Sequence, residues 1–324
     1  MKKLLYMILL LFLIFLAAPY FIVRILDPIE GDMQAPVLVI PASETPSPIP
    51  LVQADLSITD ICDFERYLIG VVAAEVPALF HFEAIRAQAV ASRTYAVYSM
   101  AAVGMDEFDY SRIHEIWQAY LTEAEMRRRW GDNFDTHFAT ISEAVISTRG
   151  EIMVYNDEPI VAVFHAFSGG MTEYSEKVWR EARPYLRSVN SDFYMHREDF
   201  EYRHKFSGNE FMVLLREEFP NITFGGGDIA NQILINERSN AGYVLRVTVG
   251  SQNMEGSRLR RILGLRSTNF TVYRELDKIV FRVRGHGHGA GMSQVGANAL
   301  AQRGYSYVEI LKHYYSGITL ERRL

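Results

Sequence analysis

The stretch YLIGVVAAEVPALFHFEAIRAQAVASRTYAVYSM, from Tyr67 to Met100, decides the fold because it encodes two helices with a sharp break between them. Apolar residues recur at helical spacing on both sides of the break. Pro77 lies at the break, where it prevents a continued helix and biases the residue before it away from helical angles. We therefore predict a helix that ends near Glu75 and a second, longer helix from Phe82.

Glu75 is the candidate acid catalyst of this helix pair. Desolvation by apolar neighbours raises the pKa of a carboxyl group and favours a protonated form that acts as an acid near neutral pH. The alternative is a solvated residue or cap, although the helix dipole slightly disfavours a negative charge at a C-terminus. The apolar residues around it in the sequence are Val71, Val72, Val76, Leu79 and Phe80.

Composition places the chain among globular proteins with an apolar N-terminal segment. Its 324 residues, 49% of them hydrophobic, suffice for one large domain or two small ones. Helical and strand-like segments alternate without order, which indicates an α+β fold. A net charge of −6 gives no reason to expect a nucleic-acid partner. With Cys62 alone, neither an internal disulfide nor a cysteine-based zinc cluster can form.

Residues 1–26 are predicted to form a transmembrane anchor. Lys2 and Lys3 precede an apolar run from Leu4 to Val23, which is about the length of a membrane-spanning helix. The lysines predict a cytoplasmic N-terminus and an outward-facing body. The alternative is a cleaved signal peptide.

Residues 27–55 are predicted to form an extracytoplasmic linker, because six of the eleven prolines lie between Pro28 and Pro50 and favour an extended spacer. Residues 56–324 are predicted to form a single ectodomain with a helical arm, in which the helix pair packs on antiparallel β-hairpins or a small sheet. The predicted strands are 151–155, 159–166, 233–235, 243–249 and 279–283, and further helices are predicted at 211–219, 256–263, 292–302 and 307–315.

Two separated motifs resemble the stage II sporulation protein D family. The first is Glu75-Val-Pro followed by AQAVASRTY at residues 87–95, and the second is GHGHGAGMSQ at residues 285–294. The resemblance covers the chain from Leu56 to its end. It implies a membrane-anchored lytic transglycosylase that remodels the cell wall during engulfment in endospore-forming bacteria.

The resemblance also implies a mechanism and a set of site residues. Protonated Glu75 would donate to the glycosidic oxygen between N-acetylmuramic acid and N-acetylglucosamine, and the C6 hydroxyl would then close a 1,6-anhydro ring. Arg93 would orient Glu75 or the substrate, with a structural ion pair to another acid as the open alternative. Arg187 lies in the stretch PYLRSV at residues 184–189, which resembles a family stretch with a basic residue lining the cleft, and an exposed surface arginine is its alternative. The predicted substrate-binding residues are Gln88, Arg93, Arg187, His286, His288, Ser293 and Gln294.

The histidines allow a metal-based alternative. His286 and His288 are two residues apart at the end of a predicted strand, so they would share a face and could bind a metal. Some members of the family hold zinc through histidine and cysteine near the position of His165, but this chain lacks those cysteines. The glycines between the histidines favour a backbone that approaches a substrate. We therefore predict no metal and no cofactor, with a metallohydrolase using these three histidines as a lower-ranked reading.

Partners and location follow from the resemblance alone. It implies glycan strands stripped of stem peptides as substrate, and two proteins as partners: stage II sporulation protein P, an amidase and endopeptidase, and the membrane protein stage II sporulation protein M. It places the catalytic body outside the cytoplasm, at the engulfing membrane or septum. A non-catalytic wall-binding module that stimulates a partner amidase is the alternative function.

Overall fold

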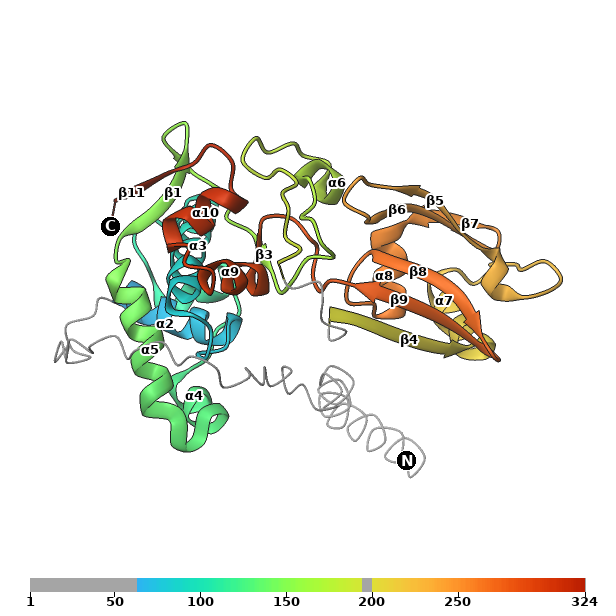
Figure 1. Ribbon diagram of the computed structural model, residues 1–324, viewed down its shortest axis with the longest axis horizontal. Helices are drawn as coiled ribbons and strands as arrows, with labels where there is room; N and C mark the ends of the chain where they lie inside the picture. The colour runs from blue at the N-terminus through green and yellow to red at the C-terminus, as the bar shows by residue number, and fades with distance from the viewer. Residues whose placement is uncertain (1–62, 194–199, 324) are drawn as a thin grey trace, which may run out of the picture. The chain divides into compact units, whose positions relative to one another are not determined.

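The computed structural model describes residues 63–193 and 200–323 (Figure 1). The predicted anchor, residues 1–26, and the predicted linker, residues 27–55, lie outside these ranges, and the domain boundaries remain predictions. Within the described ranges, no helix is long and apolar enough to cross a bilayer.

The break in the opening helix pair lies where the sequence predicts it. Helix α2 (Asp63–Glu75) ends two residues before Pro77, and helix α3 (Phe82–Ala102) follows. His81 caps α3 by accepting a hydrogen bond from the backbone N–H of Glu83 at 3.3 Å. The proline therefore separates two helices that pack on each other.

A second group of helices covers α2 and α3. Helix α5 packs against both, and the shared core is apolar, with Val71, Ile85 and Ile141 fully buried. Thr122 and Glu125 form a reciprocal capping box at the start of α4. The elements in this part of the chain are η2 (Tyr110–Glu115), α4 (Glu123–Trp130), η3 (Gly131–Asn133) and α5 (Phe134–Ser147).

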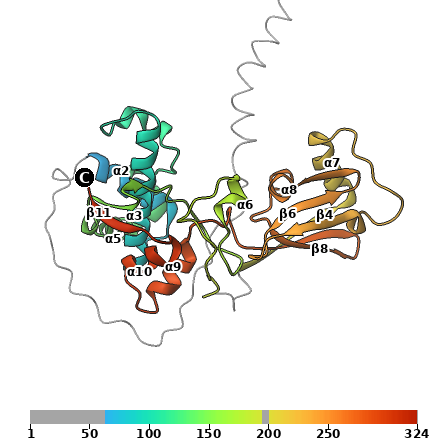
Figure 2. The same cartoon turned by 90° about the horizontal axis from the view of Figure 1, so that it is seen from above.

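Helix α3 also packs against a small antiparallel sheet with the strand order β11-β1-β2. The backbone N–H of Met153 on β1 donates to the Thr94 hydroxyl of α3 at 2.9 Å. Helices α9 and α10 contact α3 as well, and Figure 2 shows them beside it. The bounds are β1 (Glu151–Tyr155), β2 (Glu158–Pro159), β11 (Thr319–Arg322), α9 (Gln294–Ala301) and α10 (Tyr307–Tyr314).

The predicted strand at 159–166 is wrong over much of its length. Strand β2 stops at Pro159, and the backbone N–H of Val163 bonds back to the carbonyl of Val161 at 2.9 Å in a tight turn. The chain then forms the short strand β3 (Phe164–His165), which pairs in parallel with β10 (Met292–Ser293). The tight turn redirects the chain to a different partner strand.

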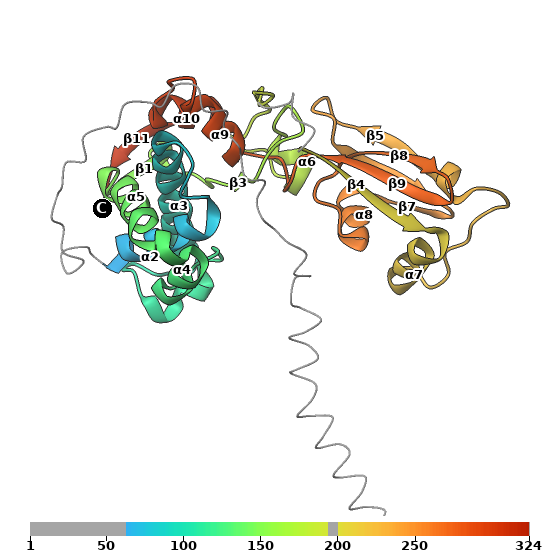
Figure 3. The same ribbon diagram turned by 60° about the horizontal axis from the view of Figure 1, so that its bottom comes forward.

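Two further antiparallel sheets surround a separate apolar core (Figure 3). One has the order β4-β9-β8, with Phe281 of the central strand fully buried, and the other has the order β5-β6-β7. Predicted strands at 279–283, 233–235 and 243–249 are confirmed, whereas β4 and β8 were not predicted. The elements are β4 (Glu201–Ser207), α7 (Gly208–Glu218), η5 (Ile229–Gln232), β5 (Ile233–Arg238), β6 (Val244–Val249), β7 (Gln252–Glu255), α8 (Gly256–Leu263), β8 (Asn269–Glu275) and β9 (Lys278–Arg284). The described residues thus form a mixed α/β fold with several small sheets.

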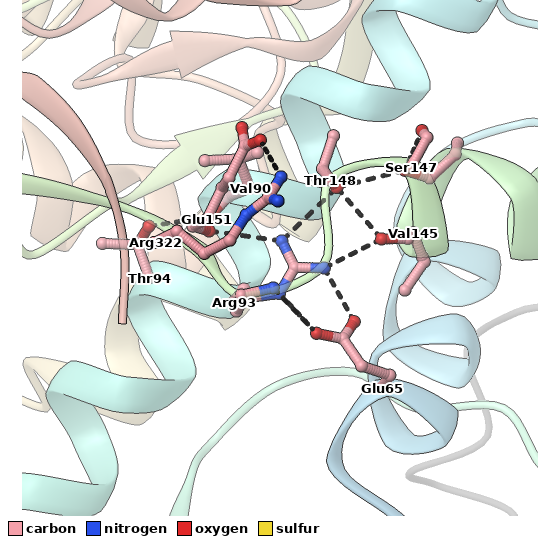
Figure 4. A network of polar contacts seen from close by, with 11 residues as sticks. Glu65, Val90, Arg93, Thr94, Val145, Ser147, Thr148, Glu151 and Arg322 are labelled. Carbon is pink, nitrogen blue, oxygen red and sulfur yellow. Dashed lines mark hydrogen bonds and ion pairs between the residues drawn. The ribbon is translucent and has the colours of Figure 1, made fainter. Parts of the chain in front are cut away.

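A buried ion pair joins the elements around the helix pair (Figure 4). The Arg93 guanidinium of α3 donates from Nε and Nη2 to the two carboxylate oxygens of Glu65 on α2, at 3.0 and 2.7 Å. It also donates to the carbonyl of Val145 at 3.0 Å and to that of Glu151 at 3.3 Å. The side chains of the ion pair are 0% and 2% exposed.

These contacts correct the prediction that Arg93 binds substrate or orients Glu75. Its guanidinium is fully enclosed and its partner is Glu65, so the structural ion pair is the alternative that the structure supports. The pair connects α2 and α3 with the end of α5 and the start of β1.

We predict that Arg93→Met lowers the free energy of unfolding by about 3–5 kcal/mol, because it leaves the Glu65 carboxylate buried without a cation. Urea denaturation followed by circular dichroism measures the change. Lys205→Met is the matched control, since Lys205 pairs with Glu275 on the surface, and its loss should cost no more than about 1 kcal/mol. Equal losses in the two variants would contradict the prediction.

Candidate active site

The carboxyl group of Glu75 meets a residue from the far end of the chain. Glu75 is the last residue of α2, and Gln294 is the first residue of α9. The Gln294 amide donates from Nε2 to Oε2 of Glu75 at 3.2 Å. The structure therefore brings the two sequence motifs together at this contact.

Burial raises the pKa of Glu75 above its ordinary value, and the hydrogen bond from Gln294 opposes that shift to a smaller extent. The direction is the one that the apolar neighbours predict. Neither influence comes from a charged group, so among the described residues no cation acts to hold the carboxyl in its ionised form. The group is thereby suited to carry a proton that it can donate.

A chain of neutral amide and hydroxyl groups orients Gln294. Its Nε2 lies 3.4 Å from Oε1 of Gln88, and the Gln88 amide donates to the hydroxyl of Ser92 at 3.1 Å. Gln88 and Ser92 are four residues apart and therefore share a face of α3. Because Gln88 offers its oxygen, the amide nitrogen of Gln294 faces both Gln88 and Glu75.

Gln118 extends the network from Ser92 to Tyr67, in the first half of α2. Gln118 donates to the backbone carbonyl of Ser92 and accepts a hydrogen bond from the Tyr67 hydroxyl, both at 3.1 Å. Burial is the main reason that the pKa of Tyr67 is raised, and the charge of Glu75 contributes to it. Sequence reasoning missed Tyr67 and Ser92. Helical spacing could have indicated Tyr67, because it lies eight residues before Glu75 on one helix and within a common helical stripe.

The glycine-rich stretch at 285–291 packs against the protein itself, which corrects the prediction that its glycines admit a substrate. Gly289 has φ +86°, and a Cβ there would overlap the Tyr243 ring. Gly291 has φ +70°, and a Cβ there would overlap the carbonyl of Val163. The backbone N–H of Glu173 also donates to the Gly289 carbonyl at 2.8 Å. These glycines are needed for close packing of neighbouring segments.

His286 and His288 lie on this stretch and are neutral near pH 7. Burial lowers the pKa of His288 to about 4, and it lowers the pKa of His286 as well. The Nδ1 atom of His288 accepts a hydrogen bond from the backbone N–H of Ala290 at 3.1 Å, so its proton resides on Nε2. The His288 ring lies 4.9 Å from the Trp179 ring. Their role as substrate ligands remains a prediction.

The arrangement of His165 does not support the metallohydrolase alternative. Its Nδ1 lies 3.1 Å from the carbonyl of Ala290, and its Nε2 lies 2.8 Å from the Ser168 hydroxyl, so both ring nitrogens have protein partners. In residues 63–193 and 200–323, no three histidine, cysteine or carboxylate side chains are grouped to hold a metal ion.

Ser293 and Arg187 are used by the protein in other contacts. Ser293 is fully buried, and its hydroxyl caps α9 by accepting the backbone N–H of Gly296 at 3.1 Å, which corrects its prediction as a substrate ligand. Arg187 pairs with Glu176 at 2.8 Å and remains partly exposed. A substrate contact by Arg187 stays a prediction.

The fold and site define a mixed α/β protein with a desolvated carboxyl group that accepts a hydrogen bond from a glutamine side chain at the break of a helix pair. The family model described as "Stage II sporulation protein" matches residues 53–155. The chain is 34% identical over 276 residues to stage II sporulation protein D of Bacillus subtilis (strain 168), covering 84% of this chain and 78% of that protein. It is 33% identical over 280 residues to stage II sporulation protein D of Bacillus amyloliquefaciens, covering 86% and 79%. The chain belongs to the stage II sporulation protein D family.

A more distant relative carries a different name. The chain is 27% identical over 299 residues to the amidase enhancer of Bacillus subtilis (strain 168). This match covers 78% of the present chain and 40% of the enhancer.

We predict that Glu75→Gln raises the free energy of unfolding near neutral pH. The raised pKa means that the folded protein binds a proton at Glu75 more readily than the unfolded chain. The stability that this proton supplies is present at low pH and is lost as the pH rises through the folded-state pKa. The neutral amide avoids that loss. The advantage of the variant should vanish below about pH 4, where the carboxyl is protonated in both states.

Urea denaturation at a series of pH values measures this difference. Glu217→Gln is the control, because Glu217 is exposed on α7, and it should show no comparable pH-dependent gain. A Glu75→Gln protein that is less stable than the wild type at pH 7 would refute the desolvation argument.

Proposed function

We propose that this protein is a membrane-anchored lytic transglycosylase that cleaves the bond between N-acetylmuramic acid and N-acetylglucosamine in glycan strands stripped of stem peptides. The observation that carries the proposal is the Glu75 carboxyl, whose pKa is raised by burial and which is held by Gln294. Family membership supplies the cell-wall setting and the role in sporulation.

The proposed reaction needs a group that is first an acid and then a base. Protonated Glu75 donates to the glycosidic oxygen as the bond from that oxygen to the anomeric carbon breaks. The carboxylate then takes the proton of the C6 hydroxyl of the same muramoyl unit, and that oxygen bonds to the anomeric carbon. The proton removed in the second step restores Glu75, and no water is consumed. The nucleophile belongs to the substrate, so little entropy is lost in placing it.

The surroundings of Glu75 fit this cycle. Hydrolysis by most glycosidases uses two carboxyl groups at a set separation, whereas the proposed reaction needs one. Burial favours the protonated acid that begins the reaction. The Gln294 amide donates to the carboxylate that forms in its middle, and Gln88 holds that amide in place. The two influences act on the pKa in opposite directions, which supports a group that is used first as an acid and then as a base.

The proposal extends to location and partners. Residues 1–26 anchor the protein, residues 27–55 form the spacer, and residues 56–324 form a catalytic domain outside the cytoplasm, at the engulfing membrane or septum. Stage II sporulation proteins P and M are the proposed protein partners. The second candidate function is a non-catalytic wall-binding module that activates an amidase, which the similarity to an amidase enhancer favours.

We predict that the full-length protein, purified in detergent, releases 1,6-anhydro-ended products from peptide-free glycan strands. Mass spectrometry distinguishes these from hydrolysis products, which are heavier by one water. Glu75→Gln should lower the cleavage rate by about 10²–10⁴-fold, because the amide can neither donate nor accept the required proton. Glu217→Gln should retain the wild-type rate.

Cleavage that survives in Glu75→Gln would exclude Glu75 as the catalyst. Hydrolysis products from the wild type would exclude transglycosylation. A wild-type protein that cleaves nothing by itself but stimulates a purified amidase would establish the second candidate function instead.

A further inference from the structure

Trp117 is an exposed tryptophan in an unusual backbone conformation. Its side chain is 83% exposed, and its φ is +59°. It follows Ile116, the C-terminal cap of η2, at a position where a left-handed residue ends the helix. Glycine or asparagine adopts this conformation with little strain, whereas a bulky aromatic residue does so at a cost. Neither the turn nor core packing therefore explains a tryptophan here.

The residues around Trp117 hold its backbone in place. Ile116 is fully buried before it, and the Gln118 amide is bonded to Tyr67 and to the backbone of α3 after it. Farther along, the Tyr120 ring stacks on the Tyr67 ring with centroids 5.6 Å apart. Strain of this kind persists where the surroundings fix the chain on both sides, and such positions cluster at functional sites.

Gly70 of α2 also contacts this segment. Its carbonyl accepts the backbone N–H of Leu121 at 3.1 Å, and a Cβ at position 70 would overlap the Tyr120 ring. The segment 116–121 is thus seated directly on α2. The Trp117 side chain is consequently presented to solvent from a rigid base.

The same segment adjoins the network that ends at Glu75. Gln118, the next residue, contacts the backbone of Ser92, and the Ser92 hydroxyl accepts from Gln88. Gln88 in turn shares the Gln294 amide with Glu75. Trp117 therefore belongs to a surface segment that is bonded to α3 at the backbone of Ser92, one helical turn from Gln88, which contacts the amide that bonds to Glu75.

We propose that Trp117 is a stacking surface for a sugar ring of the glycan strand bound at the Glu75 site. A pyranose ring exposes C–H groups on its faces and hydroxyls at its edge, and an indole offers a flat apolar face with a polar N–H. Tryptophan has only two side-chain torsions, and here its backbone is fixed by its neighbours, so little conformational entropy is lost on binding. The inference deepens the proposed function and takes its ligand class, the glycan, from it.

Binding of peptide-free glycan strands tests the proposal without turnover, in full-length protein that carries Glu75→Gln. Co-sedimentation or intrinsic tryptophan fluorescence gives the affinity. Trp117→Ala should weaken binding by about tenfold, as expected for one lost stacking contact, while Trp117→Tyr should retain most of the affinity. Trp117→Asn should weaken binding equally without lowering the melting temperature, because asparagine tolerates the left-handed conformation.

Leu276→Ala is the matched control. Leu276 is also an exposed apolar residue at positive φ, with 87% exposure and φ +56°, but it lies in the turn between β8 and β9, which explains its conformation. This variant should bind glycan as its parent does.

An unchanged affinity in Trp117→Ala would overturn the proposal, as would a parent protein that binds no glycan. Equal losses in Trp117→Ala and Leu276→Ala would also overturn it, because the effect would not be local to Trp117. Weakened adhesion of Trp117→Ala to lipid vesicles, with glycan binding intact, would assign the residue to a membrane surface instead. The two proposals can also be separated. If the wild-type protein cleaves no glycan but Trp117→Ala still weakens glycan binding, the stacking role would stand and the lytic reaction would be rejected.

Discussion

The ion pair between Arg93 and Glu65 is the constraint on which the arrangement of the helix pair depends. Two charges without solvent contact are expensive to desolvate, and they are tolerated because the guanidinium is satisfied by carboxylate and carbonyl oxygens on several sides. Those oxygens come from α2, the end of α5 and the start of β1. Correct placement of all these segments is therefore required at once. The direction in which α2 presents its final residue, Glu75, follows from that requirement.

The site itself rests on a balance between two weaker effects. Burial disfavours the charge on Glu75, and a neutral amide donor partly restores it. A cation at this point would hold the carboxyl ionised, and complete burial without a donor would hold it protonated. The proposed role of Glu75, which first gives and then receives a proton, needs neither extreme. The Arg93 guanidinium bonds to Glu65, and it is not among the influences on the Glu75 pKa.

Sequence reasoning predicted the features that depend on local rules. The helix break follows from Pro77, the direction of the Glu75 pKa follows from its apolar neighbours, and the central strand around Phe281 follows from alternation. Long-range features were out of reach. The partner of Arg93 was left open because several acids were available and spacing does not choose among them. Strand β4, which is polar and half-exposed at the edge of its sheet, carries no apolar pattern to detect.

The residues of the two family motifs have two kinds of role, structural and chemical, and matching the motifs does not show which residue has which role. Arg93, Ser293 and Gly289 serve packing and capping, whereas Glu75 and Gln294 form the candidate site.

The two groups are nevertheless connected. Gln294 and Glu75 are 219 positions apart in the sequence and are joined by a hydrogen bond of 3.2 Å, and such a contact has a narrow tolerance for displacement. Its placement depends on the parallel pairing of β10 with β3 and on the Ser293 cap at the start of α9. The motif residues used for packing and capping thus set the positions of Glu75 and Gln294. This explains why residues with no access to a ligand belong to the same short stretches as the candidate acid and its amide partner.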